Sequence, residues 1–414
     1  MSVPDFRPVI LGSDLGVYSL ARAFHEAYGV TSVVVSNQPR GPILNSAILE
    51  PEFVGAGASV EQTVVRLEEI ADRHPGTKLM LLANAEHELD LVAENRERLM
   101  QRYIVPYAPT PVLDRARDKR VLDEVCGKLG LPVPRGMHID LADATETDWV
   151  PPAHDLTFPV VAKPANSGVY TQLQFPGKRK VYLAQDAAEL AQVVQNLVRA
   201  GYQDTMMVQE LVPGDDTWGR TVTCYLDQEG RMTLMASGQL LLGMHSATMI
   251  GNSVSVLTTP QHQAMDQAGQ ILAELGMRGF VNFDLKVDPR DGRARFFDLN
   301  ARIGRPNHYL LVAGVNPAVA LVEDYLLPGT GRVQRGQRVG VYSYVPKWWL
   351  RRYLRSRTLR RQVSRAWRVT KPGPHPLVYR GDANPRRWFY RIASTVNLVR
   401  SYARDYPRPT DTGI

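Results

Sequence analysis

A strand–turn–helix–strand pattern in residues 7–36 limits the possible folds more than any other feature of the chain. The apolar run "RPVILG" predicts a strand, and the apolar side chains after it recur at helical spacing until Gly29 ends the helix. Such a βαβ unit joins two parallel strands and places the turn between strand and helix at the carboxyl edge of a sheet, where ligands bind. The turn has Gly12 and Gly16 in place of a GxGxxG fingerprint, which disfavours a dinucleotide site. The helical positions are Val17, Leu20, Ala21, Phe24 and Tyr28.

The remaining patterns extend this start into an open parallel α/β domain, expected over residues 1–113, and then a larger α+β region. A strand is expected at 78–84 and one helix at 88–103. One further helix is predicted from residue 114 to Gly130, where glycine and the following prolines end it. Beyond it we expect strands at 158–164 and from Thr205, a helix at 186–202, and hairpins that turn at Glu229–Gly230 and at 288–292.

Length and composition favour a globular cytoplasmic protein. The chain has 414 residues, enough for two or three domains, with 44% hydrophobic and 22% charged residues. Its start has no signal-peptide pattern, and its longest apolar stretch, 309–322, is shorter than a membrane span and contains Asn316 and Pro317. Cys126 and Cys224 form no CxxC pair, which argues against a zinc site and a disulfide framework.

The second hairpin carries a group of oxygen side chains. Period-two alternation in "FVNFDLKVD" places Asp284 opposite the apolar face, and in the returning strand Asp298 and Asn300 share the face opposite Phe297 and Leu299. If the hairpin is in register, Asp284, Asp298 and Asn300 converge, and three hard oxygen donors suit Mg²⁺ bound to phosphates. The alternative is a solvated hairpin with one polar face, which is a common arrangement.

Two lysines upstream of this hairpin point to phosphate binding. Lys163 ends an apolar strand and precedes the small-residue turn "PANSG", in which the backbone N–H groups of Ser167 and Gly168 can approach a phosphate closely. Lys119 begins a helix 44 positions earlier. A single lysine at a strand end is usually solvated, but two lysines ahead of an acidic hairpin favour a nucleotide triphosphate site.

The segment "QELVPGDD" predicts groups that could hold an adenosine. The main chain at Glu210 and Val212 can pair with an adenine edge, and Asp215 or Asp216 can accept hydrogen bonds from ribose hydroxyls. The alternative for this segment is an ordinary exit from a strand into a turn.

In this order, the motifs resemble the ATP-grasp superfamily of carboxylate–amine ligases. The order is Lys119, "VAKPANSG", "VQELVPGDD", "NFDLKVDPRDG" and "FFDLNARIGR". The sequences "LGSDLGVYSLARAFHEAYG" and "IGN" at 250–252 are most similar to those of the D-aspartate ligases that build peptidoglycan cross-bridges. The likeness covers the chain from residue 7 to about residue 330.

The resemblance implies an ATP-grasp fold over 114–330, with ATP between two small α+β subdomains and a lid at about 156–210. It also implies that Arg302 faces the transferring phosphate or the acyl intermediate and that Lys163 is a second catalytic residue. By the resemblance, Lys119 and Lys163 contact phosphates, Glu210, Val212 and Asp216 hold adenosine, and Asp284, Asp298 and Asn300 hold Mg²⁺. The superfamily commonly has Glu where this chain has Asp298, and the shorter side chain puts bidentate bridging of two metals in doubt.

Recognition of aspartate would need a cation, because one of its two carboxylates must be held while the other reacts. Arg220 and Arg305 are the candidate cations, and Ser246 and Thr248 are candidate hydrogen-bond donors. The resemblance also places the turn Gly12, Ser13 and Asp14 beside the amino acid. The alternative for each arginine is a surface or structural role, since arginine is mostly exposed in proteins.

The C-terminal segment, residues 331–414, is basic and expected to be partly helical. Residues 341–414 contain 17 Lys and Arg against 3 Asp and Glu, so the first 340 residues carry a net negative charge although the whole chain carries +7. Over 347–371 the pattern predicts a basic amphipathic helix with Trp, which is typical of binding to an anionic membrane surface. The alternatives are a contact with a diphosphate-bearing substrate and docking on the acidic remainder of the chain. Nucleic acid is disfavoured because no known binding module accompanies the charge. The predicted apolar positions are Leu350, Leu354, Leu359, Val363 and Trp367.

The motifs predict an ATP- and Mg²⁺-dependent ligase. The resemblance implies that it joins D-aspartate, through an acyl phosphate, to an amine of a peptidoglycan precursor peptide. A ligase for another amino acid or acceptor is the nearest alternative. A nucleotide-binding protein without turnover, attached to the inner face of a membrane, is the second.

Overall fold

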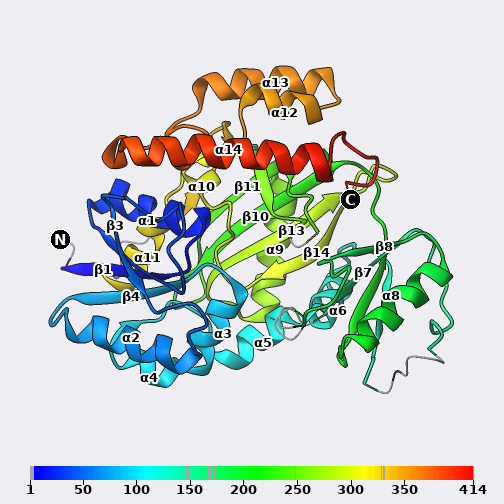
Figure 1. The fold of residues 1–414 in the computed structure, drawn as a ribbon, viewed down its shortest axis with the longest axis horizontal. Helices are drawn as coiled ribbons and strands as arrows, with labels where there is room; N and C mark the ends of the chain where they lie inside the picture. Colours follow the sequence, from blue (N-terminus) through cyan, green and yellow to red (C-terminus); the bar gives the residue numbers. More distant parts are fainter. Residues whose placement is uncertain are drawn as a thin grey trace.

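The computed structural model describes residues 4–142, 144, 149–165, 170, 173–247, 249–327, 329 and 332–413. Three sheets organise these residues (Figure 1). The first is parallel and lies near the N-terminus, the second is a large sheet at the centre, and the third is a small antiparallel sheet beside it. This mixed α/β architecture, with a parallel N-terminal domain followed by antiparallel sheets, is the fold class that the sequence predicts.

The N-terminal sheet has the strand order β3-β2-β1-β4-β5, and all its neighbours are parallel. Its first unit is the predicted one: β1 (Phe6–Leu11), α1 (Leu15–Tyr28) and β2 (Ser32–Ser36). Asp14 caps α1 by accepting from the N–H groups of Gly16 and Val17, and Gly29 ends the helix in the left-handed conformation. The other elements are β3 (Leu49–Phe53), α2 (Val60–Asp72), β4 (Lys78–Ala83) and β5 (Tyr103–Ile104).

Two predictions of single long helices are wrong. The segment 88–103 forms α3 (Glu86–Glu94) and α4 (Arg96–Met100), because the Asn95 side chain donates to the Leu91 carbonyl at 2.9 Å and interrupts the helix. The segment after residue 114 continues α5 (Thr110–Arg117) and then restarts as α6 (Lys119–Lys128). Asp118 has an extended backbone there and caps α6 by accepting from the Arg120 N–H.

The central sheet follows the order β14-β13-β10-β11-β12-β16, with antiparallel neighbours throughout. Both predicted hairpins belong to it, one formed by β10 and β11 and the other by β13 and β14. Helix α9 (His262–Leu275) packs against it (Figure 1). The strands are β10 (Gly219–Leu226), β11 (Met232–Gly243), β12 (Ser253–Leu257), β13 (Gly279–Val287), β14 (Ala294–Asn300) and β16 (Val341–Ser343), and β15 (Gln334–Arg335) pairs with β11.

The small sheet has the order β6-β9-β7-β8 and is antiparallel. Its strands are β6 (Gly136–Ile139), β7 (Val160–Pro164), β8 (Tyr182–Ala184) and β9 (Met206–Glu210). Helix α8 (Ala187–Arg199) packs against it through Leu190, Val194 and Leu197. This sheet has a hydrophobic cluster of its own, so it forms a separate body next to the central sheet (Figure 1).

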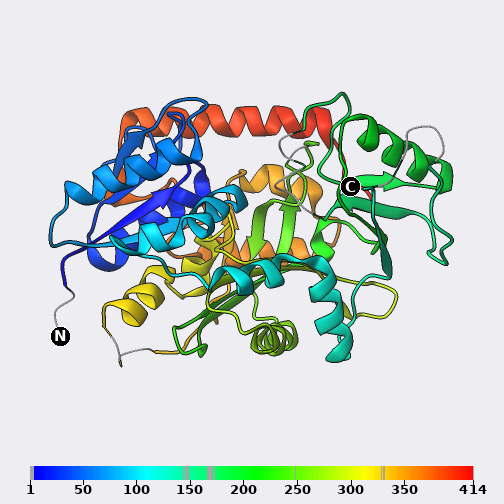
Figure 2. The ribbon, with the colours of Figure 1, turned by 90° about the horizontal axis from the view of Figure 1, so that it is seen from below.

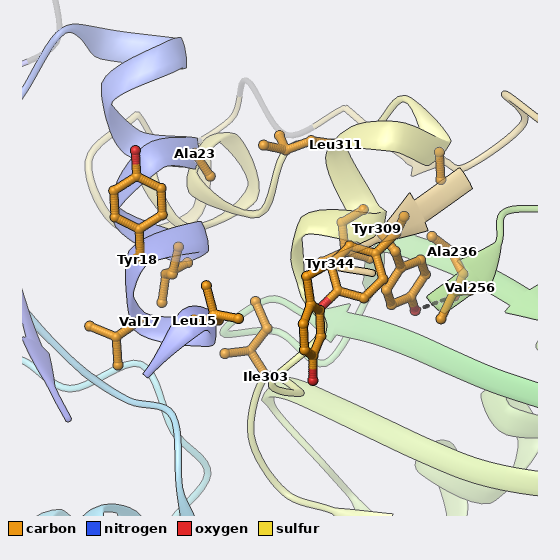
Figure 3. Packing of buried hydrophobic residues seen from close by; sticks show 14 of the residues in the cluster. Leu15, Val17, Tyr18, Ala23, Ala236, Val256, Ile303, Tyr309, Leu311 and Tyr344 are labelled. Atoms are coloured by element: carbon orange, nitrogen blue, oxygen red, sulfur yellow. Dashed lines mark hydrogen bonds between the residues drawn. The ribbon is translucent and has the colours of Figure 1, made fainter. Parts of the chain in front are cut away.

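A continuous hydrophobic core joins the N-terminal domain to the central sheet. Leu15 and Tyr18 of α1 belong to the same buried cluster as Tyr309 of α10 (His308–Ala313) and Tyr344 after β16 (Figure 3). The Tyr309 hydroxyl also donates to the Ala236 carbonyl of β11 at 3.2 Å. Because the core crosses the expected limits at residues 113 and 330, independent folding of those segments stays a prediction.

The C-terminal segment packs on the rest of the chain. The apolar face predicted for residues 347–371 lies on α12 (Lys347–Tyr353), the residue after it, and α13 (Arg357–Val369), where Leu350, Leu354, Leu359 and Val363 are buried in the core. Helix α14 (Pro385–Asp405) runs from the N-terminal sheet towards the small sheet in both views (Figures 1 and 2). Arg387 and Asp382 anchor it through a buried ion pair of 3.0 Å.

Across the described part of the chain, no helix combines the length and apolar character needed to cross a bilayer. Helix α14 is the long C-terminal one, but arginines recur along it.

Candidate active site

A cleft of about 990 Å³ lies between the central sheet and the small sheet. β13 and β14 contribute Asp284, Asp298 and Asn300 to its walls, and β7 contributes Lys163. Those residues predicted for phosphate, adenosine and metal that the structure describes therefore meet in one place, although they come from four segments of the sequence. The carboxyl end of β1 and Arg305 are not among the residues that line it.

Asp284 and Asp298 face each other as partners in the β13–β14 ladder. Burial, together with the charge of Asp298, raises the pKa of Asp284 to about 7. Burial also acts to raise the pKa of Asp298, but the positive charges of Lys119, Lys163, Lys180 and Arg302 outweigh it, so that pKa is lowered. The negative charge of two carboxylates held this close is only partly balanced by the neighbouring cations. A bound divalent cation would balance the rest.

Asn300 lies between this pair and Arg302. Its Nδ2 donates to Asp284 Oδ2 at 3.4 Å, and its Oδ1 accepts from Arg302 Nη2 at 3.2 Å. Ligation of a metal beside Asp284 would need the amide oxygen on that side, which a 180° turn of the amide supplies. Within the described residues, no group of three or more His, Cys, Asp and Glu could hold a metal ion, so the oxygen set depends on two carboxylates and this amide.

Arg302 is held by an acidic residue that the sequence analysis did not identify. Its Nε lies 2.8 Å from Oε1 of Glu86, at the start of α3, and its Nη1 donates to the Ile303 carbonyl at 3.2 Å. Both Glu86 and Arg302 line the cleft. The N-terminal domain thus fixes the guanidinium beside the acidic pair.

The lysines approach from the opposite side of the cleft. Lys163 Nζ donates to the Phe297 carbonyl at 3.0 Å and lies 5.4 Å from the centre of the Phe297 ring. Burial and the neighbouring charge of Lys119 lower the pKa of Lys163 to about 7. Lys119 Nζ donates to the Pro164 carbonyl at 3.4 Å, so the two ammonium groups lie at the same end of β7. A bound phosphate would favour the charged form of Lys163.

A β-bulge explains why Phe297 is in the cleft. The ladder pairs Asp284 with Asp298 but Leu285 with Phe296, so Phe297 is the extra residue of β14. The expectation that Phe297 shares a face with Leu299, opposite Asp298, is therefore wrong, because Phe296 takes that place and is fully buried.

The groups predicted for adenosine lie along one wall. Glu210 ends β9, and Val212 follows it, and both line the cleft. Asp215 Oδ1 is used for capping a short turn, where it accepts from Thr217 N at 3.0 Å. Asp216 Oδ2 accepts from Gly243 N at 2.8 Å and lies 2.9 Å from His245 Nε2. Ser167 and Gly168 lie outside the described residues, as does Thr248.

The residues predicted for the amino acid divide into two groups. Arg220 lines the cleft, but its Nη1 donates to the Thr217 and Gly219 carbonyls and its Nε donates to Gln261. Burial lowers its pKa to about 10. Ser246 lies in the turn after β11, where its carbonyl accepts from the N–H groups of Met249 and Ile250, and it does not line the cleft.

The second group surrounds the N-terminus of α1. Gly12 has φ of +106°, and a Cβ there would lie 2.4 Å from Glu88 Oε1, so glycine is required. Ser13 follows it in the same turn. Asp14 Oδ2 lies 2.7 Å from Arg305 Nε, while its Oδ1 accepts from Asn84 Nδ2 at 3.0 Å. Arg305 Nη1 is buried and, among the described residues, has no hydrogen-bond partner.

Several cleft residues were missed in the sequence. Lys180 lines the cleft, and its charge acts on both Asp284 and Asp298. Lys286, two residues after Asp284 on the same face of β13, has a pKa lowered to about 8 by burial. The run "KRK" at 178–180 and the alternation of β13 were the available signals for these lysines. Thr412 and Gly413 also line the cleft, and nothing in the sequence indicated it.

Comparisons with known proteins agree with this geometry. The family described as the carbamoyl-phosphate synthase L chain ATP-binding domain matches residues 118–311. A D-aspartate ligase of Enterococcus faecium (strain Aus0004) is 28% identical over 393 residues, which cover 93% of each chain.

Solved structures share the fold at low identity. A crystal structure of an L-amino acid ligase from Bacillus licheniformis superposes with a TM-score of 0.54 at 18% identity, over 78% of this chain and 75% of that one. The biotin carboxylase domain of the Hydrogenobacter thermophilus 2-oxoglutarate carboxylase, solved with MgADP, gives 0.55 at 14% identity, over 82% and 74%.

The parallel domain, the two facing sheets and the basic and acidic walls of the cleft agree with the ATP-grasp ligases that the chain resembles over residues 118–311 and over 93% of the D-aspartate ligase. The enzyme class that these findings support is an ATP-grasp ligase, which forms a C–N bond.

Proposed function

We propose that the enzyme activates a carboxylate of D-aspartate as an acyl phosphate and joins it to a side-chain amine of a peptidoglycan precursor peptide. The observation that carries the proposal is the cleft in which Asp284, Asp298 and Asn300 face Lys163 and Lys119. The choice of D-aspartate is supported by the similarity to a D-aspartate ligase, which extends over 93% of both chains.

ATP and Mg²⁺ are the cofactors that the donor set fits. Asp284, Asp298 and Asn300 would hold Mg²⁺, which supplies charge neutralisation on the transferring phosphoryl group when bound. Lys119, Lys163, Ser167 and Gly168 would contact the phosphates, and Glu210, Val212, Asp215 and Asp216 the adenosine.

The chain's own residues then have separate tasks. Lys163 and Lys119 attract the phosphates from one wall and hold them opposite the acidic pair. Arg302, fixed by Glu86, provides a positive group where charge develops on the reacting carboxyl oxygen and on the tetrahedral intermediate formed by the amine. The small sheet, which forms much of the lid expected at 156–210, would exclude water that could hydrolyse an acyl phosphate.

For the amino acid, Arg305 is a better carboxylate ligand than Arg220. Arg305 has a buried Nη1 without a partner in the described structure, whereas the Nε and Nη1 of Arg220 already donate to protein oxygens. Gly12, Ser13 and Asp14 would line the same subsite, because Asp14 contacts Arg305. Ser246 would lie at the margin.

A cytoplasmic enzyme attached to the inner face of the membrane is part of the proposal, but α14 rather than 347–371 would make the contact. Phe389, Ile392 and Val396 are exposed and recur at helical spacing on α14, next to exposed Trp388. Exposed Arg386 and Arg400 lie on the same helix, which suits a surface of anionic lipid.

The test is ADP release by the purified full chain, measured with ATP, Mg²⁺, a peptidoglycan precursor pentapeptide and one amino acid at a time. We expect release that requires both the peptide and D-aspartate. Equal release with L-aspartate or D-alanine would contradict the choice of amino acid, and release that ignores the peptide would contradict the acceptor.

A further inference from the structure

The C-terminal segment reaches the nucleotide cleft, far from the motifs in sequence. The Asp411 carbonyl accepts from the Gly214 N–H at 2.7 Å, and the Thr412 carbonyl accepts from Lys286 Nζ at 3.0 Å. Thr412 and Gly413 line the cleft, and a Cβ built on Gly413 would lie 3.4 Å from Asp216 Oδ1. Figure 1 shows this end of the chain beside the central sheet, at the end of α14.

Three rings from separate elements form a stack behind this wall. Tyr406, which follows α14, lies on His245 with ring centres 3.4 Å apart and planes 4° apart. The ring of Tyr353, on α12, is also nearly parallel to that of Tyr406, with ring centres 5.8 Å apart and planes 9° apart. The Tyr353 hydroxyl also donates to the Tyr406 carbonyl at 2.9 Å. The stack fixes the plane of the His245 ring, whose side chain is 3% exposed.

Both groups that contact Asp216 Oδ2 are held by the C-terminal segment. His245 Nε2, at 2.9 Å from this oxygen, is held by the Tyr406 ring. The Gly243 N–H, at 2.8 Å, belongs to a residue whose carbonyl accepts from the Tyr402 hydroxyl at 2.6 Å. Tyr402 and Tyr406 are four residues apart, so they emerge on the same side of the helix end. The position of Asp216 thus depends on two tyrosines of the basic segment.

We propose that Tyr406, through His245, is a positioning residue for nucleotide binding, and that the C-terminal segment is a structural wall of the nucleotide site. The inference rests on the proposed role of Asp216 towards the ribose. Loss of the ring would leave His245 free to turn, and Asp216 would lose a directed partner. The effect would fall on affinity for the nucleotide, because no atom of Tyr406 is among those placed at the reacting groups.

The experiment measures MgADP binding to the full-length protein by calorimetry, without amino acid or peptide. We expect Tyr406→Ala and Tyr406→Leu to weaken MgADP binding by about tenfold, the scale of one aromatic stacking contact. Tyr406→Phe keeps the ring and should bind within about twofold of the unchanged chain. Trp348→Ala, an exposed aromatic on α12, is the matched control and should not change binding. In turnover, KM for ATP should rise for Tyr406→Leu while kcat stays within about twofold.

Each outcome has a distinct meaning. Unchanged affinity for MgADP in both Tyr406→Ala and Tyr406→Leu would overturn the inference. Tighter binding would also overturn it, because the C-terminal segment would then obstruct the nucleotide site. If Tyr406→Ala melts below the assay temperature, Tyr406→Leu decides the matter, since it keeps the site apolar. If the unchanged chain does not bind MgADP, the proposed function is contradicted. If only the Tyr406 variants bind MgADP weakly, the proposed function stands and the positioning role of Tyr406 is supported.

Discussion

Asp284 on β13 and Asp298 on β14 are direct partners across one rung of a ladder, and the β-bulge beside them leaves Phe297 unpaired, with its carbonyl accepting from Lys163 Nζ. The carboxylate pair and the contact with Lys163 therefore adjoin the same irregularity in β14. The pKa of Asp284 is raised by burial and by the charge of Asp298. The pKa of Asp298 is lowered, because the positive charges of the lysines and Arg302 outweigh the effect of burial. This arrangement is the basis for the first two predictions.

Asp298→Asn should abolish most of the turnover, because it removes one of two carboxylates that compensate a bound cation. We expect ADP release to fall roughly 100-fold or more at saturating ATP, with a higher requirement for Mg²⁺. Asp291→Asn, in the turn of the same hairpin, is the matched control and should keep its activity. Normal activity of Asp298→Asn at low Mg²⁺ would contradict the metal role.

Arg302→Ala should separate turnover from nucleotide binding. We expect kcat for ADP release to fall by roughly two orders of magnitude, while MgADP affinity measured by calorimetry changes by no more than about threefold. Glu86→Gln should lower kcat less, because it removes only the negative charge that fixes the Arg302 guanidinium. Arg293→Ala, on the exposed hairpin turn, serves as the control. Equal losses of affinity and turnover in Arg302→Ala would argue for a structural role.

Gly12→Ala should destabilise the N-terminal domain for two reasons that can be separated. Its φ of +106° is strained for alanine, and the new Cβ would collide with Glu88 Oε1 at 2.4 Å. Gly55 has nearly the same φ, +105°, but open space around it. In urea unfolding we expect Gly55→Ala to cost about 1 kcal/mol and Gly12→Ala about 2 kcal/mol more. Similar losses in both variants would show that the contact with Glu88 does not matter.

Glu88 should make stability depend on pH. Burial raises the pKa of its carboxyl from 4.5 to about 7, so the folded chain keeps a proton that the unfolded chain loses. The free energy of unfolding therefore falls as the pH rises from 4.5 to about 7.

The matched variant is Glu88→Gln, which can still accept from the N–H groups of Asn84 and Ala85. Relative to the unchanged chain, it should gain on the order of 3 kcal/mol at pH 8 and very little near pH 4.5. Urea unfolding at both pH values measures this difference, with exposed Glu97→Gln as the control. A constant difference between Glu88→Gln and the unchanged chain at the two pH values would refute the assignment.

The exposed apolar face of α14 can be tested apart from catalysis. Cosedimentation with vesicles of phosphatidylglycerol should retain the chain, and vesicles of phosphatidylcholine should not. Phe389→Ser combined with Ile392→Ser should abolish retention, while Val65→Ser, an exposed change on α2, should not. Retention that survives the double change would rule out α14 as the contact.

Much of the site could be predicted because its residues lie in locally regular strands. The alternation of β13 and β14 correctly brought Asp284, Asp298 and Asn300 to one face, since side chains alternate in any strand. The same rule failed at Phe297, because a bulge shifts the register and leaves no clear trace in the sequence. Helix breaks at Asn95 and Asp118 were missed for a similar reason, as both residues are tolerated within helical patterns until their side chains bind the backbone.

Contacts between distant segments could not be predicted. Glu86 meets Arg302, and Thr412 meets Lys286, only because the N-terminal domain and the C-terminal segment pack against the central sheet. The amphipathic pattern of 347–371 was real, but it cannot distinguish a membrane from the chain's own core as the apolar partner. Burial of Leu350 and Val363 in that core shows which partner these side chains have.

The most direct test of the account follows oxygen during turnover. D-aspartate labelled with oxygen-18 in its carboxylates is incubated with the enzyme, ATP, Mg²⁺ and the precursor peptide, and the inorganic phosphate is examined by mass spectrometry. If the carboxylate attacks the γ-phosphoryl group and the amine then displaces phosphate, each ligation leaves one labelled oxygen in the phosphate and releases ADP. Unlabelled phosphate, or release of AMP and pyrophosphate, would contradict an acyl phosphate formed in this cleft.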